Sequence, residues 1–375
     1  MPTWLKRLAR RCLLTFLTLS VTLAASACSP WTRSVQAPQA VEKRAADLRA
    51  KRGQPGAAPS APPRQAVIYY ATGDGRYLLP LTVEVGPGPS MPRVAVEKFL
   101  AGPPQGLAKS LLPVEMKLRD FWIDGDTAYV DLAGDPIAWA KKADPQSLKQ
   151  ALQGLVLTLT DFSGIHQVQL LVNGNSLPSL GGIDLKAPLG RPLWINPLPP
   201  TSGKALGGPV VRDQESEAAK GLWPGARSDW SVAEPSWVTV YYADSQLAYL
   251  VPVTVGIRAG EEPMKAAVEA LLAGPPKGSG LLSPIQRDTR LLSLKVKNGL
   301  ATVDLTRKAL EYGGGSANEL FLVNSLLLTL TDFPGVEQVQ LLFGGQKVEV
   351  LPEGTNVGQP LSRPPLNPVS SLPAK

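Results

Sequence analysis

The chain has 375 residues, a formal net charge of +7, 44% hydrophobic residues and 18% charged residues. Residues 1–27 contribute +4 and residues 28–65 contribute +5, so the rest of the chain carries −2 and shows no basic stripe for binding nucleic acid. Both cysteines are N-terminal, and His166 is the only histidine. This composition excludes a disulfide framework and most metal or Ser–His catalysis in the body of the protein, and it predicts no cofactor.

Residues 1–27 resemble the signal peptide of a bacterial lipoprotein. Four basic residues precede an apolar run of sixteen residues, which is too short for a comfortable membrane span. Small residues stand directly before Cys28, as in a lipobox, although Ala25 occupies the place where leucine is most common. We therefore expect lipid on Cys28 and anchoring on the extracytoplasmic side of the cell membrane. The alternatives are an uncleaved signal anchor and a plain secreted protein, and both also place residues 31–375 outside the cytoplasm.

The rest of the chain contains two copies of one pattern. A Tyr-Tyr pair, a Leu-Ala-Gly-Pro-Pro turn, a Thr-Leu-Thr-Asp-Phe segment and an Asn-Pro pair recur in the same order, starting at Tyr69, Leu100, Thr158 and Asn196 and again at Tyr241, Leu272, Thr329 and Asn367. A repeat of this length indicates two domains of one kind. We divide the chain into a signal peptide (1–27), a Pro/Ala/basic tether (28–65), domain 1 (66–198), a linker (199–236), domain 2 (237–369) and a tail (370–375).

Each copy begins with a predicted hairpin, a helix and a second hairpin. In the first copy the strands are predicted at Val67–Ala71, Tyr77–Val85, Leu118–Ile123 and Thr127–Leu132. The helix between the hairpins has one apolar stripe, formed by Ala95, Val96, Phe99 and Leu100, and ends at a Gly-Pro-Pro turn. In the second copy Asn298-Gly299 is a strong signal for the turn of the second hairpin.

A longer helix and a final strand complete each copy. Asp144 is expected to cap this helix in the first copy, and Ser316 to Glu319 has the form of a capping box in the second. The apolar stripe is Leu152, Leu155, Val156 and Leu159, matched by Val323, Leu326, Leu327 and Leu330, and the final strands are Gln167–Val172 and Gln338–Phe343. The order β-β-α-β-β-α-β predicts an α/β fold of the α+β type: two tandem copies of a small two-layer domain, with a mixed β-sheet and two helices on one face.

These motifs resemble the GerMN domain family over nearly all of both copies. The second copy also has Tyr312 followed by three glycines before its long helix, as that family often does, whereas the first copy lacks this feature. The resemblance implies a role in sporulation and germination of spore-forming bacteria. It also implies a likeness to the ring-building motifs of secretion-like complexes. It supplies no catalytic residues to carry over.

The repeated tyrosines Tyr69, Tyr70, Tyr241 and Tyr242 are the candidate surface for a ligand or a partner. Neighbouring residues of a strand point to opposite faces, so we expect one tyrosine of each pair in the core and the other on the surface.

Other candidates favour structural roles. His166 is replaced by Glu337 in the second copy, which argues against catalysis. Asp161 and Asp332 are expected to bond turn amides at helix ends, and Asp131 and Asp304 close strands. The glycines 313–315 favour a flexible loop over an anion site, because they lack the lysine and the spacing of a P-loop.

Two classes of non-catalytic function remain. The first is an assembly or scaffold module that contacts other envelope or sporulation proteins, and an exposed apolar or strand-edge patch would favour it. The second is a module that binds peptidoglycan or another cell-wall polymer, and an aromatic groove would favour that. We expect no enzymatic activity, no metal site and no nucleic-acid partner.

Overall fold

A computed structural model describes residues 64–85, 90–104, 108–113, 115–198, 237–257, 260–313 and 315–369. The predicted signal peptide, Cys28, the linker, the tail and nearly all of the tether lie outside the described residues. None of the helices in the described ranges is both long and apolar enough to cross a membrane.

Both copies contain the predicted strands and helices in the predicted order. In copy one these are β1 (Gln65–Ala71), β2 (Leu78–Glu84), α2 (Met91–Ala101), β3 (Lys117–Asp124), β4 (Thr127–Ala133), α3 (Pro136–Lys142), α4 (Pro145–Thr160) and β5 (Gln167–Val172), followed by the two-residue strands β6 (Asn175–Ser176), β7 (Ser179–Leu180), β8 (Ile183–Asp184) and β9 (Leu189–Gly190). In copy two they are β10 (Trp237–Ala243), β11 (Leu250–Gly256), α6 (Pro263–Ala273), β12 (Leu291–Lys297), β13 (Leu300–Leu305), the 3-10 helix η1 (Arg307–Leu310), α7 (Gly315–Thr331), β14 (Gln338–Phe343) and β15 (Leu361–Ser362). The short helix α3 was not predicted.

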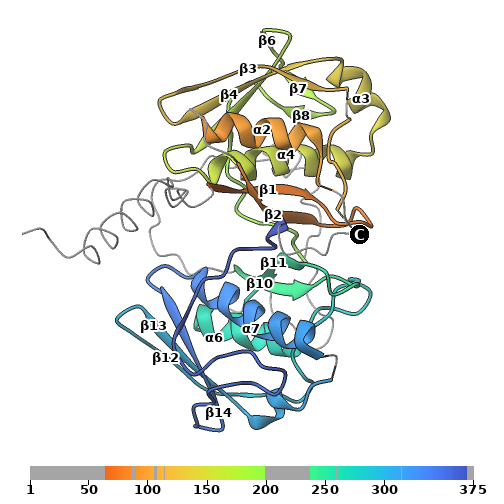
Figure 1. Cartoon of the computed structure of the whole chain (residues 1–375). Coiled ribbons are helices and arrows are strands. Elements are labelled where there is room, and N and C mark those ends of the chain that lie inside the picture. The colour runs from red at the N-terminus through yellow and green to blue at the C-terminus, as the bar shows by residue number, and fades with distance from the viewer. Residues whose placement is uncertain are drawn as a thin grey trace, which may run out of the picture. The chain divides into compact units, whose positions relative to one another are not determined.

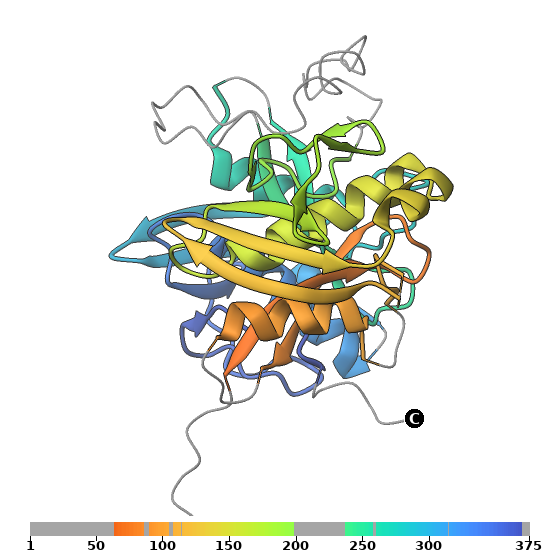
Figure 2. The same ribbon diagram turned by 90° about the horizontal axis from the view of Figure 1, so that it is seen from above.

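The predicted mixed α/β class is confirmed, and the first hairpin adds a layer to it. In copy one, β3 is antiparallel to β4 and β4 is parallel to β5, which makes a mixed sheet. The β1–β2 hairpin forms a separate antiparallel sheet on the other side of the helices. Helices α2 and α4 therefore lie between two sheets, and α6 and α7 do so in copy two (Figure 1). Viewed from above, the β3–β4 hairpin lies on the outer side of copy one, with α2 beside it (Figure 2).

The helix stripes form the core as predicted. All eight stripe residues of α4 and α7 are buried, as are the four of α2. The Asp144 side chain caps α4 by accepting a hydrogen bond from the Ser147 amide at 2.9 Å. The capping-box prediction for copy two is wrong, because α7 begins at Gly315 and the Glu319 side chain points into the protein.

The two copies meet through their first hairpins, where β2 lies against β11. The C-terminal segment of each copy runs along the hairpin of the other. Thr82 in β2 donates its amide to the Leu366 carbonyl at 3.0 Å, and the equivalent Thr254 in β11 donates to the Ile195 carbonyl at 2.9 Å. A single cluster of buried hydrophobic residues includes side chains from both copies. The described part of the tandem is thus joined by reciprocal contacts, with matching residues on each side.

Candidate functional site

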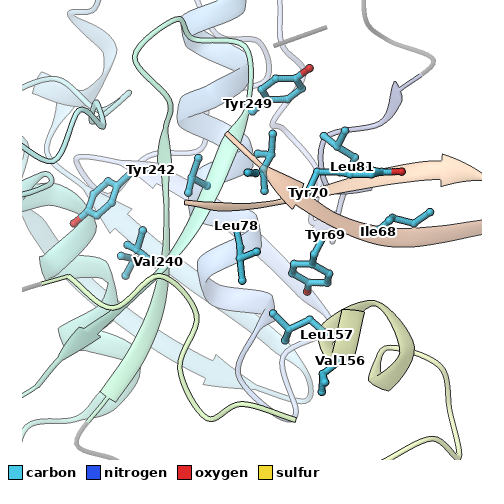
Figure 3. Packing of buried hydrophobic residues seen from close by; sticks show 14 of the residues in the cluster. Ile68, Tyr69, Tyr70, Leu78, Leu81, Val156, Leu157, Val240, Tyr242 and Tyr249 are labelled. Atoms are coloured by element: carbon cyan, nitrogen blue, oxygen red, sulfur yellow. The ribbon is translucent and has the colours of Figure 1, made fainter. Parts of the chain in front are cut away.

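The four repeated tyrosines are all buried, so the expectation that one of each pair lies on the surface is wrong. Tyr70 and Tyr242 are only 1% exposed, and their hydroxyls donate to the carbonyls of Lys98 and Ala270 in the first helices. Tyr69 and its equivalent Tyr241 point to the other face of the hairpin, towards the end of the long helix. Figure 3 shows Tyr69 beside the long helix α4. The prediction failed because this face of the hairpin is covered too, by α4 and by the other copy.

Each of these inner tyrosines belongs to a cluster with an aspartate and an arginine. In copy one the Tyr69 hydroxyl donates to Asp161 at 3.5 Å, and Arg191 pairs with the same carboxylate at 2.7 Å. In copy two the Tyr241 hydroxyl donates to Asp332 at 3.0 Å. Arg363 contacts both groups there: it lies 2.8 Å from the carboxylate of Asp332 and donates to the phenol oxygen of Tyr241 at 3.1 Å.

We call these two groups the Tyr–Asp–Arg clusters. The sequence suggested that the carboxylates of Asp161 and Asp332 bond turn amides. Among the described residues they do not; each carboxylate binds an arginine and a tyrosine hydroxyl instead. The ion pair ties the loop that carries the arginine to the end of the long helix.

The clusters lie in surroundings that shift the protonation of their members. Burial raises the pKa of Asp161, more than Arg191 and Tyr69 lower it, and burial likewise raises the pKa of Asp332. Burial also raises the pKa of Tyr69, with a further contribution from the charge of Asp161. Burial lowers the pKa of Arg191, but the charges and hydrogen bonds of Asp161 and Tyr69 together outweigh this, so the net pKa is raised and the arginine stays charged.

Both clusters line one cavity between the two copies, which we call the interface pocket. Its volume is about 600 Å³. Tyr69, Asp161 and Arg191 contribute from copy one, and Tyr241, Asp332 and Arg363 contribute from copy two. Prolines, threonines and aliphatic residues of both copies, together with Gln65, complete the lining. A cavity of this size, with aromatic rings and a few polar groups, is suited to a small molecule or to one unit of a polymer.

Two asparagines fasten the copies beside this pocket. The Asn196 amide group donates to the carbonyl of Leu78 in its own copy and to that of Pro252 in the other copy, both at 2.8 Å, and its oxygen accepts the Leu78 amide at 2.7 Å. Asn367 makes the matching three bonds, to Leu250 twice and to Pro80 of copy one. An asparagine is needed here because it offers two donors and an acceptor on one short side chain.

The remaining sequence candidates have structural positions. His166 is exposed, and its amide donates to the Asp126 carbonyl at 2.8 Å. Asp131 and Asp304 are buried and accept the amides of Gly174 at 3.0 Å and Gly345 at 2.9 Å, which fixes the turns after the final strands. Gly315 has φ of +72° and is the first residue of α7, so this glycine provides the backbone conformation at the start of the helix. The described residues contain no cluster of His, Cys, Asp or Glu that could hold a metal ion.

Sequence reasoning missed the buried carboxylate of Glu319. This side chain is 0% exposed and accepts the amides of Glu353 and Thr355, both at 2.7 Å, together with the Tyr312 hydroxyl. Leu148 stands at the equivalent position of copy one and is buried too. The signal was present in the sequence, because this glutamate occupies a place in the apolar stripe where copy one has leucine.

The fold and its repeated clusters define a tandem α/β protein with a composite pocket between its copies. The chain belongs to the Germane family, described as sporulation and spore germination, whose model matches residues 67–178 and 239–349. It is 29% identical over 304 residues to the spore germination protein GerM of Bacillus subtilis (strain 168), which covers 77% of this chain and 74% of that protein. The solved structure of the tandem GerMN domains of GerM from Bacillus subtilis matches with a TM-score of 0.58 and 26% identity, over 81% of this chain and 99% of that one.

Proposed function

We propose that this protein is a lipid-anchored, extracytoplasmic and non-catalytic assembly protein in sporulation and spore germination. Family membership supports the process, and the name of the similar GerM protein carries no enzymatic activity. The N-terminal sequence supports the anchor at Cys28 and the location at the cell membrane.

The joining of the two copies carries the proposal. Each copy contributes one asparagine, Asn196 or Asn367, that bonds to the other copy; we call these two the clamp asparagines. Each copy also places its C-terminal segment along the hairpin of the other. The outer surfaces of the two copies are therefore held at a fixed position relative to each other. A scaffold gains from this arrangement, because two linked weak sites bind together with a high effective concentration. The Tyr–Asp–Arg clusters do not resemble a catalytic set, since each carboxylate is neutralised by its own arginine. The partners would be other envelope or sporulation proteins.

The anchor is tested by comparing the wild type with Cys28→Ala in the native host. The wild type is expected to enter the detergent phase and to lack residues 1–27, whereas Cys28→Ala keeps them or leaves the membrane. Spore yield and germination should fall in the variant to the level of a strain without the protein. Identical partitioning of both proteins, with residues 1–27 retained in both, would show that Cys28 carries no lipid.

The interface pocket favours a second candidate, the binding of peptidoglycan or another wall polymer. Its tyrosines and arginines could contact a sugar or the carboxylate of a peptide. Co-sedimentation with purified peptidoglycan distinguishes the two functions. Polymer binding predicts that the wild type pellets and that Arg191→Ala with Arg363→Ala reduces pelleting at least tenfold, whereas an assembly protein stays in the supernatant.

A further inference from the structure

The interface pocket carries no net charge on its described lining. Its charged residues are two acids and two bases, Asp161, Arg191, Asp332 and Arg363. Each aspartate pairs with the arginine of its own copy, at 2.7 Å and 2.8 Å, so the two charges of a pair largely cancel over a short distance. A ligand with a net charge therefore gains little attraction from this lining and loses its hydration on entering.

The paired groups keep hydrogen-bonding capacity for a ligand. Arg191 directs Nη1 to both Asp161 and Thr160, and its contact with the Tyr69 hydroxyl still leaves guanidinium N–H groups over. Arg363 uses Nη1 and Nη2 for its bonds to described residues and keeps Nε. The two side chains are 43% and 38% exposed. Each carboxylate oxygen also has a second lone pair, so each cluster offers a donor beside an acceptor.

A sugar matches this arrangement better than a peptide or a free ion. A hydroxyl donates and accepts from the same oxygen, so one hydroxyl can bond an arginine N–H and the neighbouring carboxylate together. A trans peptide unit has its N–H and C=O on opposite sides, so it reaches only one of these two partners. Hydroxyls are also uncharged, and they cost less to bury than charged groups.

An aromatic surface continues the pocket at one end. Trp237, Thr239 and Tyr241 share one face of β10 because they alternate along the strand, and Thr239 and Tyr241 line the pocket. Trp237 is partly exposed and packs against Trp194, with ring centroids 5.3 Å apart. Trp194 is 44% exposed and follows Leu193, which also lines the pocket. An exposed indole ring is a stacking surface for the apolar C–H face of a sugar.

The repeat does not supply this aromatic surface at the other end of the pocket. Gln65 occupies the position of Trp237 in copy one. The segment between Arg363 and Asn367 is one residue shorter than the equivalent segment of copy one and contains no tryptophan. The pocket therefore has a direction, as a site for a chain of sugar units requires.

We propose that the interface pocket binds a neutral sugar chain, with one unit between the Tyr–Asp–Arg clusters and the next unit on Trp194 and Trp237. The proposal rests on the second candidate function and deepens it, because it selects the sugar chain of a wall polymer, rather than its peptide, as the ligand. It also gives the doubled fold a role that one copy cannot fill, since each copy supplies only part of the lining.

Isothermal titration calorimetry on the full chain, in a detergent without a sugar headgroup, tests the proposal. The probes are triacetylchitotriose and cellotriose, which are neutral sugar trimers with and without acetamido groups, and the peptide Ala-Glu-Lys. At least one trimer is expected to bind with saturation, and the peptide is expected not to bind. Binding of the peptide alone, or of no probe, would overturn the proposal.

Two variants and one control locate the site. Trp194→Ala should weaken binding of the trimer about threefold to tenfold. The matched control Trp122→Ala removes a tryptophan of similar exposure, 41%, from β3 and should leave binding unchanged. Asp161→Asn leaves Arg191 without its charged partner, so binding of the neutral trimer should fall about tenfold or more. The same variant should gain affinity for the anionic trimer of galacturonate.

The site is wrong if Trp194→Ala binds the trimer like the wild type, or if Trp122→Ala loses as much affinity. Circular dichroism checks that each variant is folded, and the exposed Trp194→Ala decides the question if Asp161→Asn is unstable. The failures are distinguishable. A protein that pellets with peptidoglycan but binds neither trimer contacts the wall through another surface, and the Cys28 test of the assembly protein does not depend on the pocket.

Discussion

Replacing the clamp asparagines with aspartate should show how much the interface between the copies contributes to the stability of the protein, as distinct from the core of each copy. Asn196→Asp keeps the oxygen that accepts the Leu78 amide, and it keeps a side chain that tolerates the positive φ of 47°. It removes the two donors that hold the Leu78 and Pro252 carbonyls. The new carboxylate oxygen then faces two carbonyl oxygens.

The size of the effect follows from the lost bonds. Each hydrogen bond contributes about 0.5–1.5 kcal/mol, and a buried acceptor without a donor adds to the loss. We expect Asn196→Asp to lower the free energy of unfolding by about 2–4 kcal/mol and the Tm by about 5–10 °C. Asn367→Asp should have a similar effect, because its three bonds are equivalent.

Thermal unfolding of the full chain in detergent, followed by circular dichroism, measures these changes. The matched control is Asn175→Asp, because Asn175 is exposed and its amide bonds only the nearby Asn173 carbonyl at 3.2 Å. That control should stay within about 0.5 kcal/mol of the wild type. If Asn196→Asp is as stable as this control, the clamp asparagine does not hold the copies together, and its bonds contribute little to the free energy of unfolding.

Two further predictions concern single side chains. Burial raises the pKa of Glu319, but the hydrogen bonds from Thr355, Tyr312 and Glu353 outweigh it, so the net pKa is lowered below its usual 4.5. The stabilisation of the fold by this carboxylate is therefore present above the unfolded pKa and is lost as the pH falls through the folded pKa. Glu319→Gln should therefore destabilise by about 1–3 kcal/mol at pH 7. Urea unfolding over a series of pH values below 4.5 should show this difference shrinking as the pH falls through the folded pKa; a difference that stays constant over the whole series would refute the assignment. His166→Gln should leave stability within about 0.5 kcal/mol and spore germination unchanged, since the side chain is exposed, whereas lost germination in a folded variant would support catalysis.

Much of the fold could be predicted because the local signals agreed with the tertiary structure. The final strands have the predicted bounds, Gln167–Val172 and Gln338–Phe343, since apolar residues lie between glycine turns there. The helix α3 was missed because it has only seven residues and depends on Asp135 as its cap. The separate first sheet could not be predicted, since a hairpin pattern does not say which strands lie beside it.

The candidate site was only partly predictable. The tyrosines and the aspartates were found because they repeat, but their arginine partners lie about thirty residues beyond the aspartates, in loops without a regular pattern. The repeat did contain a signal, because Arg191-Pro192 recurs as Arg363-Pro364. Searching for repeated charged residues in loops, as well as in helices and strands, would have found both arginines.

Comparing the two copies of this chain separates the surfaces that build the tandem from those that face outwards. The residues at the junction are the same in both copies: the inner tyrosine, its aspartate and arginine, the clamp asparagine, and the threonine that bonds the C-terminal segment of the other copy. The outer sheets differ, because Trp122 and Tyr129 of copy one are replaced by Lys295 and Thr302 in copy two. The junction between the copies uses matching residues from both sides, whereas the outer sheets have diverged. The outer sheets are therefore where this protein is expected to meet its partners.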